Sequence, residues 1–160
     1  MLCFYFRKEY IMRREILLVR RNLATQEVLA DGVVDQGSVY RRFFEGCQCT
    51  RPVVSEGTAT TINATGLYKI EVEATFTAPA AGDVTLQLFE NGVAIDGAFA
   101  TETITTATTE VRSITFSTYV VVDQTRVLGI TAFNPKSYTL VNTGVAATFT
   151  RVQVAVKNEV

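Results

Sequence analysis

The sequence of 160 residues contains no histidine. Histidine is the usual general base at neutral pH and a frequent metal ligand, so serine–histidine and cysteine–histidine catalytic pairs are excluded. Glu71 and Glu73 lie two positions apart, as expected for the exposed face of a strand. The remaining acidic candidates near turns lack the spacing of a calcium loop, and they are Asp83, Glu90, Asp96, Glu102 and Asp123. We therefore expect no enzyme, no cofactor and no metal.

Cysteine is scarce, with Cys3, Cys47 and Cys49 only. An odd count of three does not provide a disulfide framework. Cys47 and Cys49 form a Cys-x-Cys pair, which supplies two thiolates where zinc takes four ligands. A trimer would pool six such sulfurs at its axis. We favour idle or buried thiols over a metal site or an inter-chain bond.

Long apolar runs are also missing, so no segment reaches the length of a membrane span. The opening MLCFYFRKEYIM is apolar first and basic second, which is the wrong order for a signal peptide. We expect neither secretion nor a membrane partner. Because Met12 is a second methionine, residues 1–11 are as readily an upstream extension as a structural element.

Net charge is close to zero, at −1, which argues against nucleic acid as a partner. The charge is uneven, with +3 over residues 1–51 and −4 over residues 52–160. The basic doublets Arg20-Arg21 and Arg41-Arg42 belong to the first part. They fit contact with an acidic protein surface and simple solvation equally well.

From residue 52 onward, short runs of Val, Ile, Thr and Phe alternate with Gly, Asn, Asp and Pro breaks, which is typical of an all-β sandwich. The stretch 66–77 alternates without a miss and predicts an inward face of Tyr68, Ile70, Val72, Ala74 and Phe76. No helix of any length is expected, because stripes of helical period are absent. About eight strands are predicted, within 58–65, 66–77, 84–93, 94–106, 110–123, 125–135, 138–144 and 145–158.

The first fifty residues differ, since they hold most of the Lys and Arg and little periodic apolar sequence. Residues 14–22 predict a strand or a short helix, residues 31–38 a turn, and residues 38–44 a strand. This composition predicts an extended anchoring arm over 1–51 and a jelly-roll domain over 52–160.

Particular stretches also carry a resemblance. GLYKIEVEA (66–74) resembles a strand of the tumour necrosis factor and complement globular-head superfamily. Residues 62–104 and 139–157 resemble the C-terminal jelly-roll domains of exosporium glycoproteins and of related phage proteins. Residues 14–43, with the Cys-x-Cys that follows, resemble the N-terminal piece of small phage proteins of the head-fibre or decoration type.

The resemblance implies a compact homotrimer of jelly rolls about a threefold axis. It also implies a structural protein of a tailed phage, assembled in the bacterial host cytoplasm and located on the capsid surface of the virion. Its partner would be the major capsid protein or another virion protein. We expect the trimer interface at Leu67, Phe89, Phe99, Phe133 and Phe149, and the anchor at Arg20, Arg21, Arg41, Arg42, Phe43 and Phe44.

An adhesive or receptor-binding module is the alternative, such as a fibre tip or a spore-coat-like protein that binds surface glycans. It predicts outward loops with clustered aromatic and amide side chains. Loops 90–98 and 133–144 are the candidates, with Phe133, Asn134 and Tyr138 as ligand contacts.

Overall fold

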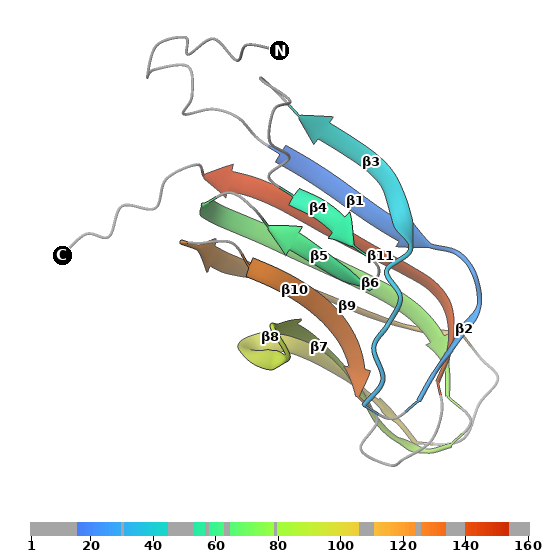
Figure 1. Cartoon of the computed structure of the whole chain (residues 1–160). Coiled ribbons are helices and arrows are strands. Elements are labelled where there is room, and N and C mark those ends of the chain that lie inside the picture. The colour runs from blue at the N-terminus through green and yellow to red at the C-terminus, as the bar shows by residue number, and fades with distance from the viewer. Residues whose placement is uncertain are drawn as a thin grey trace, which may run out of the picture.

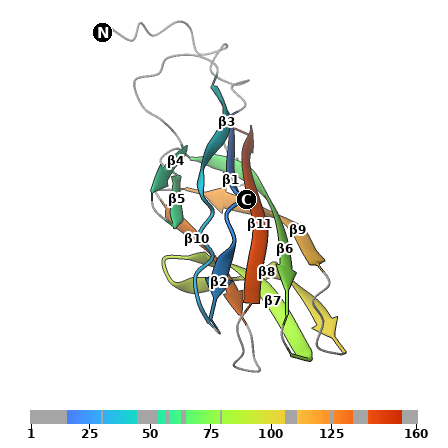
Figure 2. The same ribbon diagram turned by 90° about the vertical axis from the view of Figure 1, so that its right-hand side faces the viewer.

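The computed structural model describes residues 16–29, 31–44, 53–56, 58–62, 65–78, 80–105, 111–123, 126–133 and 140–153. Two sheets pack face to face with antiparallel neighbours throughout, as the ribbons of Figures 1 and 2 show. The larger sheet contains β1 (Ile16–Asn22), β2 (Gln26–Val28), β3 (Ser38–Phe44), β6 (Gly66–Thr77), β9 (Arg112–Val122) and β11 (Leu140–Gln153). The smaller sheet contains β4 (Val53–Glu56), β5 (Ala59–Ile62), β7 (Gly82–Glu90), β8 (Val93–Ile104) and β10 (Arg126–Phe133).

Strand order in both sheets is non-sequential, which defines a jelly roll. The larger sheet runs β3-β1-β11-β6-β9, with β2 also paired to β11, and the smaller sheet runs β4-β5-β10-β7-β8. Chain connections therefore cross repeatedly between the sheets. The predicted all-β jelly-roll class is confirmed. No helix that could span a membrane occurs among the residues that the structure describes.

Alternation of apolar and polar residues positions the core, because successive strand side chains point to opposite faces. On β6 the five residues predicted to face inward are all buried, from Tyr68 at 0% to Phe76 at 2% exposure. Val84, Leu86 and Leu88 of β7 face them from the smaller sheet and are equally buried. The core thus fills the space between the two sheets.

The strands of the predicted arm belong to the sandwich itself. β1 lies between β3 and β11, and its residues Ile16–Asn22 pair with Arg151–Val145 of β11. Leu18, Val28 and Val34 are buried in the same core as β6. Residues 16–44 therefore form part of the folded domain, because their few apolar side chains are buried only against the rest of the chain. That residues 1–51 also anchor the chain to another protein remains a prediction.

Strand boundaries differ from the sequence-based prediction at two places. β2 and β4 were not expected, since each is only a few residues long. The strands predicted within 138–144 and 145–158 are continuous over Leu140–Gln153 as the single strand β11, with a register shift between Asn142 and Gly144 where they were expected to separate. A bulge accommodates the glycine without ending the strand.

A buried arginine joins the two sheets. Arg20 of β1 is 2% exposed and donates hydrogen bonds to Gly37 O at 2.6 and 3.0 Å and to Ala59 O at 2.6 Å. It also donates to Thr60 Oγ1 at 3.2 Å and to Gln36 Oε1 at 3.4 Å, and both of these residues are fully buried. Burial lowers the pKa of Arg20, and the charge of nearby Asp35 opposes that effect. The prediction that Arg20 is a surface anchor is wrong, because its guanidinium is buried and hydrogen-bonded inside the fold.

Candidate interaction surface

The outward side of the larger sheet is the candidate surface, and we call it the outer face. It consists of the side chains of opposite parity to the core residues on β1, β6, β9 and β11, together with those of β3, whose Phe43 and Arg41 pair with Leu17 and Val19. Cross-strand registers arrange them in rows, since neighbouring strands lie about 4.8 Å apart. One row aligns Phe43, Leu17, Thr150, Lys69 and Tyr119, and the next pairs Leu67 with Val121 beside Val152.

Exposed aromatic side chains end the first row on either side of Thr150 and Lys69, and the second row is apolar; both rows lie at one end of the outer face. Phe43 is 56% exposed, Tyr119 61%, Val121 46% and Val152 43%. Val152 lies at a register shift of β11 against β6, between Arg151 and Gln153. Large apolar side chains gathered on one side of a sheet mark an interaction surface more often than singly scattered ones do.

Basic groups lie on the β1 and β3 side of the outer face. The guanidinium of Arg21 lies 5.2 Å from the centre of the Tyr40 ring, and that of Arg41 lies 5.5 Å from it. Tyr40 itself is 55% exposed. Both cations are thus held at the surface by contact with one aromatic ring.

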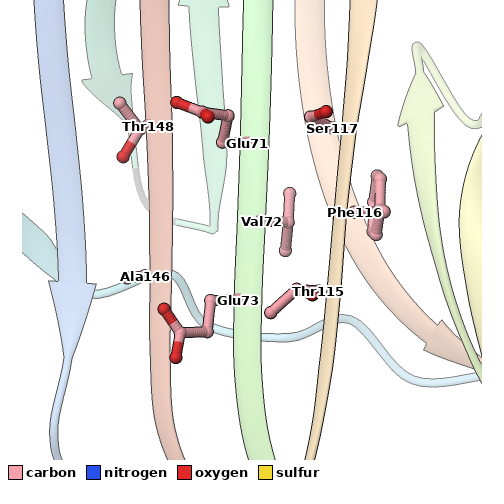
Figure 3. Close-up of a pocket in the computed structure, with 8 residues that line it drawn as sticks. All are labelled: Glu71, Val72, Glu73, Thr115, Phe116, Ser117, Ala146 and Thr148. Atoms are coloured by element: carbon pink, nitrogen blue, oxygen red, sulfur yellow. The ribbon is translucent and has the colours of Figure 1, made fainter.

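Acidic and hydroxyl groups lie on the β6 side. Glu71 and Glu73 project from β6 on the same side as Thr148 and Ala146 of the neighbouring β11 (Figure 3). Together with the small side chains of Thr115 and Ser117 of β9, they line an open hollow. Lys69 pairs with Glu71 at 3.2 Å, and no ion pair of Glu73 occurs among the described residues.

The hollow offers groups suited to binding a polar or charged partner. Its two carboxylates accept hydrogen bonds and attract cations, while its three hydroxyls both donate and accept. No group of three His, Cys, Asp or Glu residues able to hold a metal ion occurs in the part of the chain that the structure describes.

The five predicted interface residues do not share one surface. Phe149 is wrong as an interface residue, because it is 0% exposed and points into the core beside Val145 and Ala147. Leu67 lies on the outer face, half-buried. Phe89 and Phe99 belong to the smaller sheet, where Phe99 is 51% exposed and faces away from the core. The Phe133 backbone ends β10, and its side chain lies outside the described residues.

The predicted anchor residues divide in a similar way. Arg21, Arg41 and Phe43 lie on the outer face, and Arg42 is exposed on β3. Phe44 is described only as the backbone residue that pairs with Ile16. Of the predicted ligand loop, Asn134 and Tyr138 lie outside the described residues.

Sequence reasoning missed Tyr40, Tyr119 and Val121. Alternation in the sequence could have indicated the two β9 residues, since Tyr119 and Val121 alternate with the core residues Val120 and Val122 and therefore point outward.

No family model and no curated protein matches this chain. Solved structures do match its fold. Murine APRIL at pH 5.0 superposes with a TM-score of 0.65 at 10% identity, over 86% of this chain and 99% of that one. Eiger TNF from S. frugiperda gives a TM-score of 0.64 at 12% identity, over 92% and 99%. The globular domain of zebrafish complement 1qA protein gives 0.58 at 9% identity, over 84% and 94%. The chain therefore has the tumour necrosis factor-like jelly-roll fold.

Proposed function

We propose that this chain is a non-enzymatic structural module that assembles into a homotrimer through the outer face. The observation that carries this proposal is the exposure of four large apolar side chains on the outer face, Phe43, Tyr119, Val121 and Val152. Burying a large apolar side chain stabilises an assembly by about 1.5–3 kcal/mol. Three copies would bury three such sets. The resemblance of residues 66–74 to the tumour necrosis factor superfamily supports a threefold arrangement.

Sedimentation of the full-length chain tests the trimer. We expect a species of about 53 kDa, three times the 17.6 kDa chain. Tyr119→Asp should shift it toward monomer, because the substitution removes an exposed aromatic ring and places a carboxylate beside Val121. Phe99→Asp is the matched control, since Phe99 is 51% exposed on the smaller sheet. A monomeric wild type contradicts the proposal, and dissociation by Phe99→Asp alone would move the interface to the smaller sheet.

We further propose that the trimer decorates the capsid of a tailed phage or forms its head fibre, bound to the major capsid protein or another virion protein. Sequence resemblance alone supports this setting. Three weak anchors on one rigid trimer would bind a repetitive shell with avidity. Purified particles should carry the chain in stoichiometric amounts. Removal of residues 1–11, which spares every described strand, tests whether the extreme N-terminus contributes to particle binding. If the shortened chain binds particles as the wild type does, the anchor lies in another part of the chain.

Glycan binding by the β7–β8 hairpin is the alternative function. Asn91 and Gly92 form its turn, with φ of 50° and 80°, and Val93 beyond it is 70% exposed. The nearby Phe99 would offer a sugar an apolar surface. A glycan array with wild type and Phe99→Ser distinguishes the two functions. A specific glycan signal lost in Phe99→Ser would favour adhesion.

A further inference from the structure

We propose that the outer faces of two copies recognise each other by charge. Arg21 and Arg41 of one copy enter the hollow of the next copy that holds Glu71 and Glu73. This inference rests on the proposed homotrimer and adds the residues that set how neighbouring copies align.

The two charges lie on separate halves of one surface. Arg21 of β1 and Glu73 of β6 are each paired in register with Ala146 of the intervening β11. Two strand spacings, about 10 Å of backbone, separate them. Gly144 and Ala146 leave a hollow between the two side chains, and no ion pair between them occurs among the described residues. The halves therefore remain available to a second molecule.

The basic half is pre-arranged for docking. Both guanidiniums contact the Tyr40 ring, at 5.2 and 5.5 Å, so less side-chain freedom is lost when they bind. A guanidinium presents several N–H donors in one plane, which matches a carboxylate.

The acidic half offers the matching acceptors. Glu73 has no cation within ion-pair distance among the described residues, whereas Glu71 forms an ion pair with Lys69. Thr115, Ser117 and Thr148 line the same hollow and add hydroxyl acceptors. Because the side chains of Thr115, Ser117 and Thr148 are small, the hollow has room for an arginine side chain from another copy.

Closed symmetry makes the pairing reciprocal. In a ring, each copy presents one half of its surface to the neighbour on one side and the other half to the neighbour on the other side. The apolar rows continue along the same face, so their burial would exclude water around the charged contact. Ion pairs in such surroundings fix the relative alignment of partners and suppress incorrect ones.

Charge reversal in the full-length chain tests the inference. Arg21→Glu and Glu73→Arg should each weaken assembly about tenfold or more, measured by sedimentation equilibrium. The double variant should assemble more tightly than either single variant, because positions 21 and 73 again carry opposite charges. Asp96→Arg on the smaller sheet is the control for Glu73→Arg, since Asp96 is exposed and gains the same charge. It should assemble as the wild type does.

Mixing distinguishes contact between copies from contact within one. Each single variant brings like charges together at positions 21 and 73 in all three interfaces of its own trimer. A mixed trimer contains only one such interface and two complementary ones. The mixture should therefore assemble more tightly than either variant alone and less tightly than the wild type. Far-UV circular dichroism and melting at low concentration would confirm that each variant folds.

Three outcomes overturn the inference. A trimer insensitive to both reversals refutes it and leaves the homotrimer standing. Weakened single variants with no recovery on mixing or in the double variant show that these charges do not pair. A monomeric wild type refutes the homotrimer and the inference together.

Discussion

Arg20 and Thr60, forty positions apart in the chain, are joined by a hydrogen bond of 3.2 Å in the interior of the sandwich. The bond connects β1 of the larger sheet to β5 of the smaller one. Thr60 Oγ1 in turn donates to Gln36 Oε1 at 3.0 Å, and Gln36 Nε2 donates to Thr58 O at 2.8 Å. Polar groups this deeply buried are costly unless every partner is present, so the network specifies one alignment of the sheets.

Arg20→Met should destabilise the fold strongly. It removes five hydrogen bonds and leaves the carbonyl oxygens of Gly37 and Ala59 without the guanidinium donor. We expect a loss of about 3 kcal/mol or more. Arg21→Met, its exposed neighbour, should cost less than about 0.5 kcal/mol in dilute solution where assembly does not contribute. Urea unfolding of both variants gives the comparison, and equal losses would show that the network contributes little.

Gly37→Ala should be far more costly than Gly92→Ala. Both glycines have positive φ, 77° and 80°, so each alanine substitution lowers the free energy of unfolding by about 1 kcal/mol through the left-handed conformation alone. An added Cβ meets open space at Gly92 but lies 2.2 Å from the backbone O of Arg21 at Gly37. Since backbone must move there, we expect about 3 kcal/mol or more.

Thermal denaturation of the two alanine variants measures this difference directly. The φ cost cancels between them, so the remaining gap reports the close approach of Gly37 to β1. Melting temperatures that fall equally would contradict the packing that positions the Gly37 carbonyl against Arg20.

Stability should fall at alkaline pH because of Tyr68. Burial raises the pKa of Tyr68 to about 12, an effect that the charge of Arg151 partly offsets. An unfolded tyrosine ionises near pH 10, so the unfolded chain releases its proton first. Stability from this group is complete below about pH 10 and declines as pH rises toward 12, by about 2–3 kcal/mol.

Urea unfolding at pH 9 and pH 11.5 tests this dependence. Tyr68→Phe, whatever its stability at pH 9, should lose less between the two pH values than the wild type does. Parallel losses in both proteins would assign the alkaline effect to other groups.

A fragment of residues 52–160 should not fold as an independent jelly roll. It lacks β1, so the edge of β11 that pairs with Ile16–Asn22 would be exposed and prone to aggregate. It also lacks Leu18 and Arg20 from the interior. The chain lacking residues 1–11 is the control and should unfold cooperatively. A soluble 52–160 fragment with a cooperative melt would contradict the integration of β1 into the sheet.

Local periodicity was enough to predict the sheet class and the inward face of β6. The same alternation, within the strand predicted over 110–123, runs through Ile114, Val120 and Val122, which are buried, and through Phe116, which is partly buried. Alternation is a property of neighbouring residues, so one sequence reveals it without knowledge of the partner strands.

The burial of Arg20 and Phe149 could not be predicted from the sequence, because it depends on residues that lie far away along the chain. Nothing local in Arg20-Arg21 shows which arginine turns inward; that depends on Leu18 entering the core and on acceptors at Gly37 and Ala59. Alternation read from the valines after residue 151 puts Phe149 on the side opposite to them. The register shift at Arg151 separates that run from the buried one.

The pairing of Ile16 with Arg151 brings the first and last described strands side by side in opposite directions. The start of β1 and the end of β11 thus lie at one pole of the sandwich, where Phe43 and Val152 also lie. A label placed directly before Ile16 or after Gln153 would crowd that pole. Insertion at Asn91-Gly92, in an exposed turn of the smaller sheet, would keep such a label clear of it.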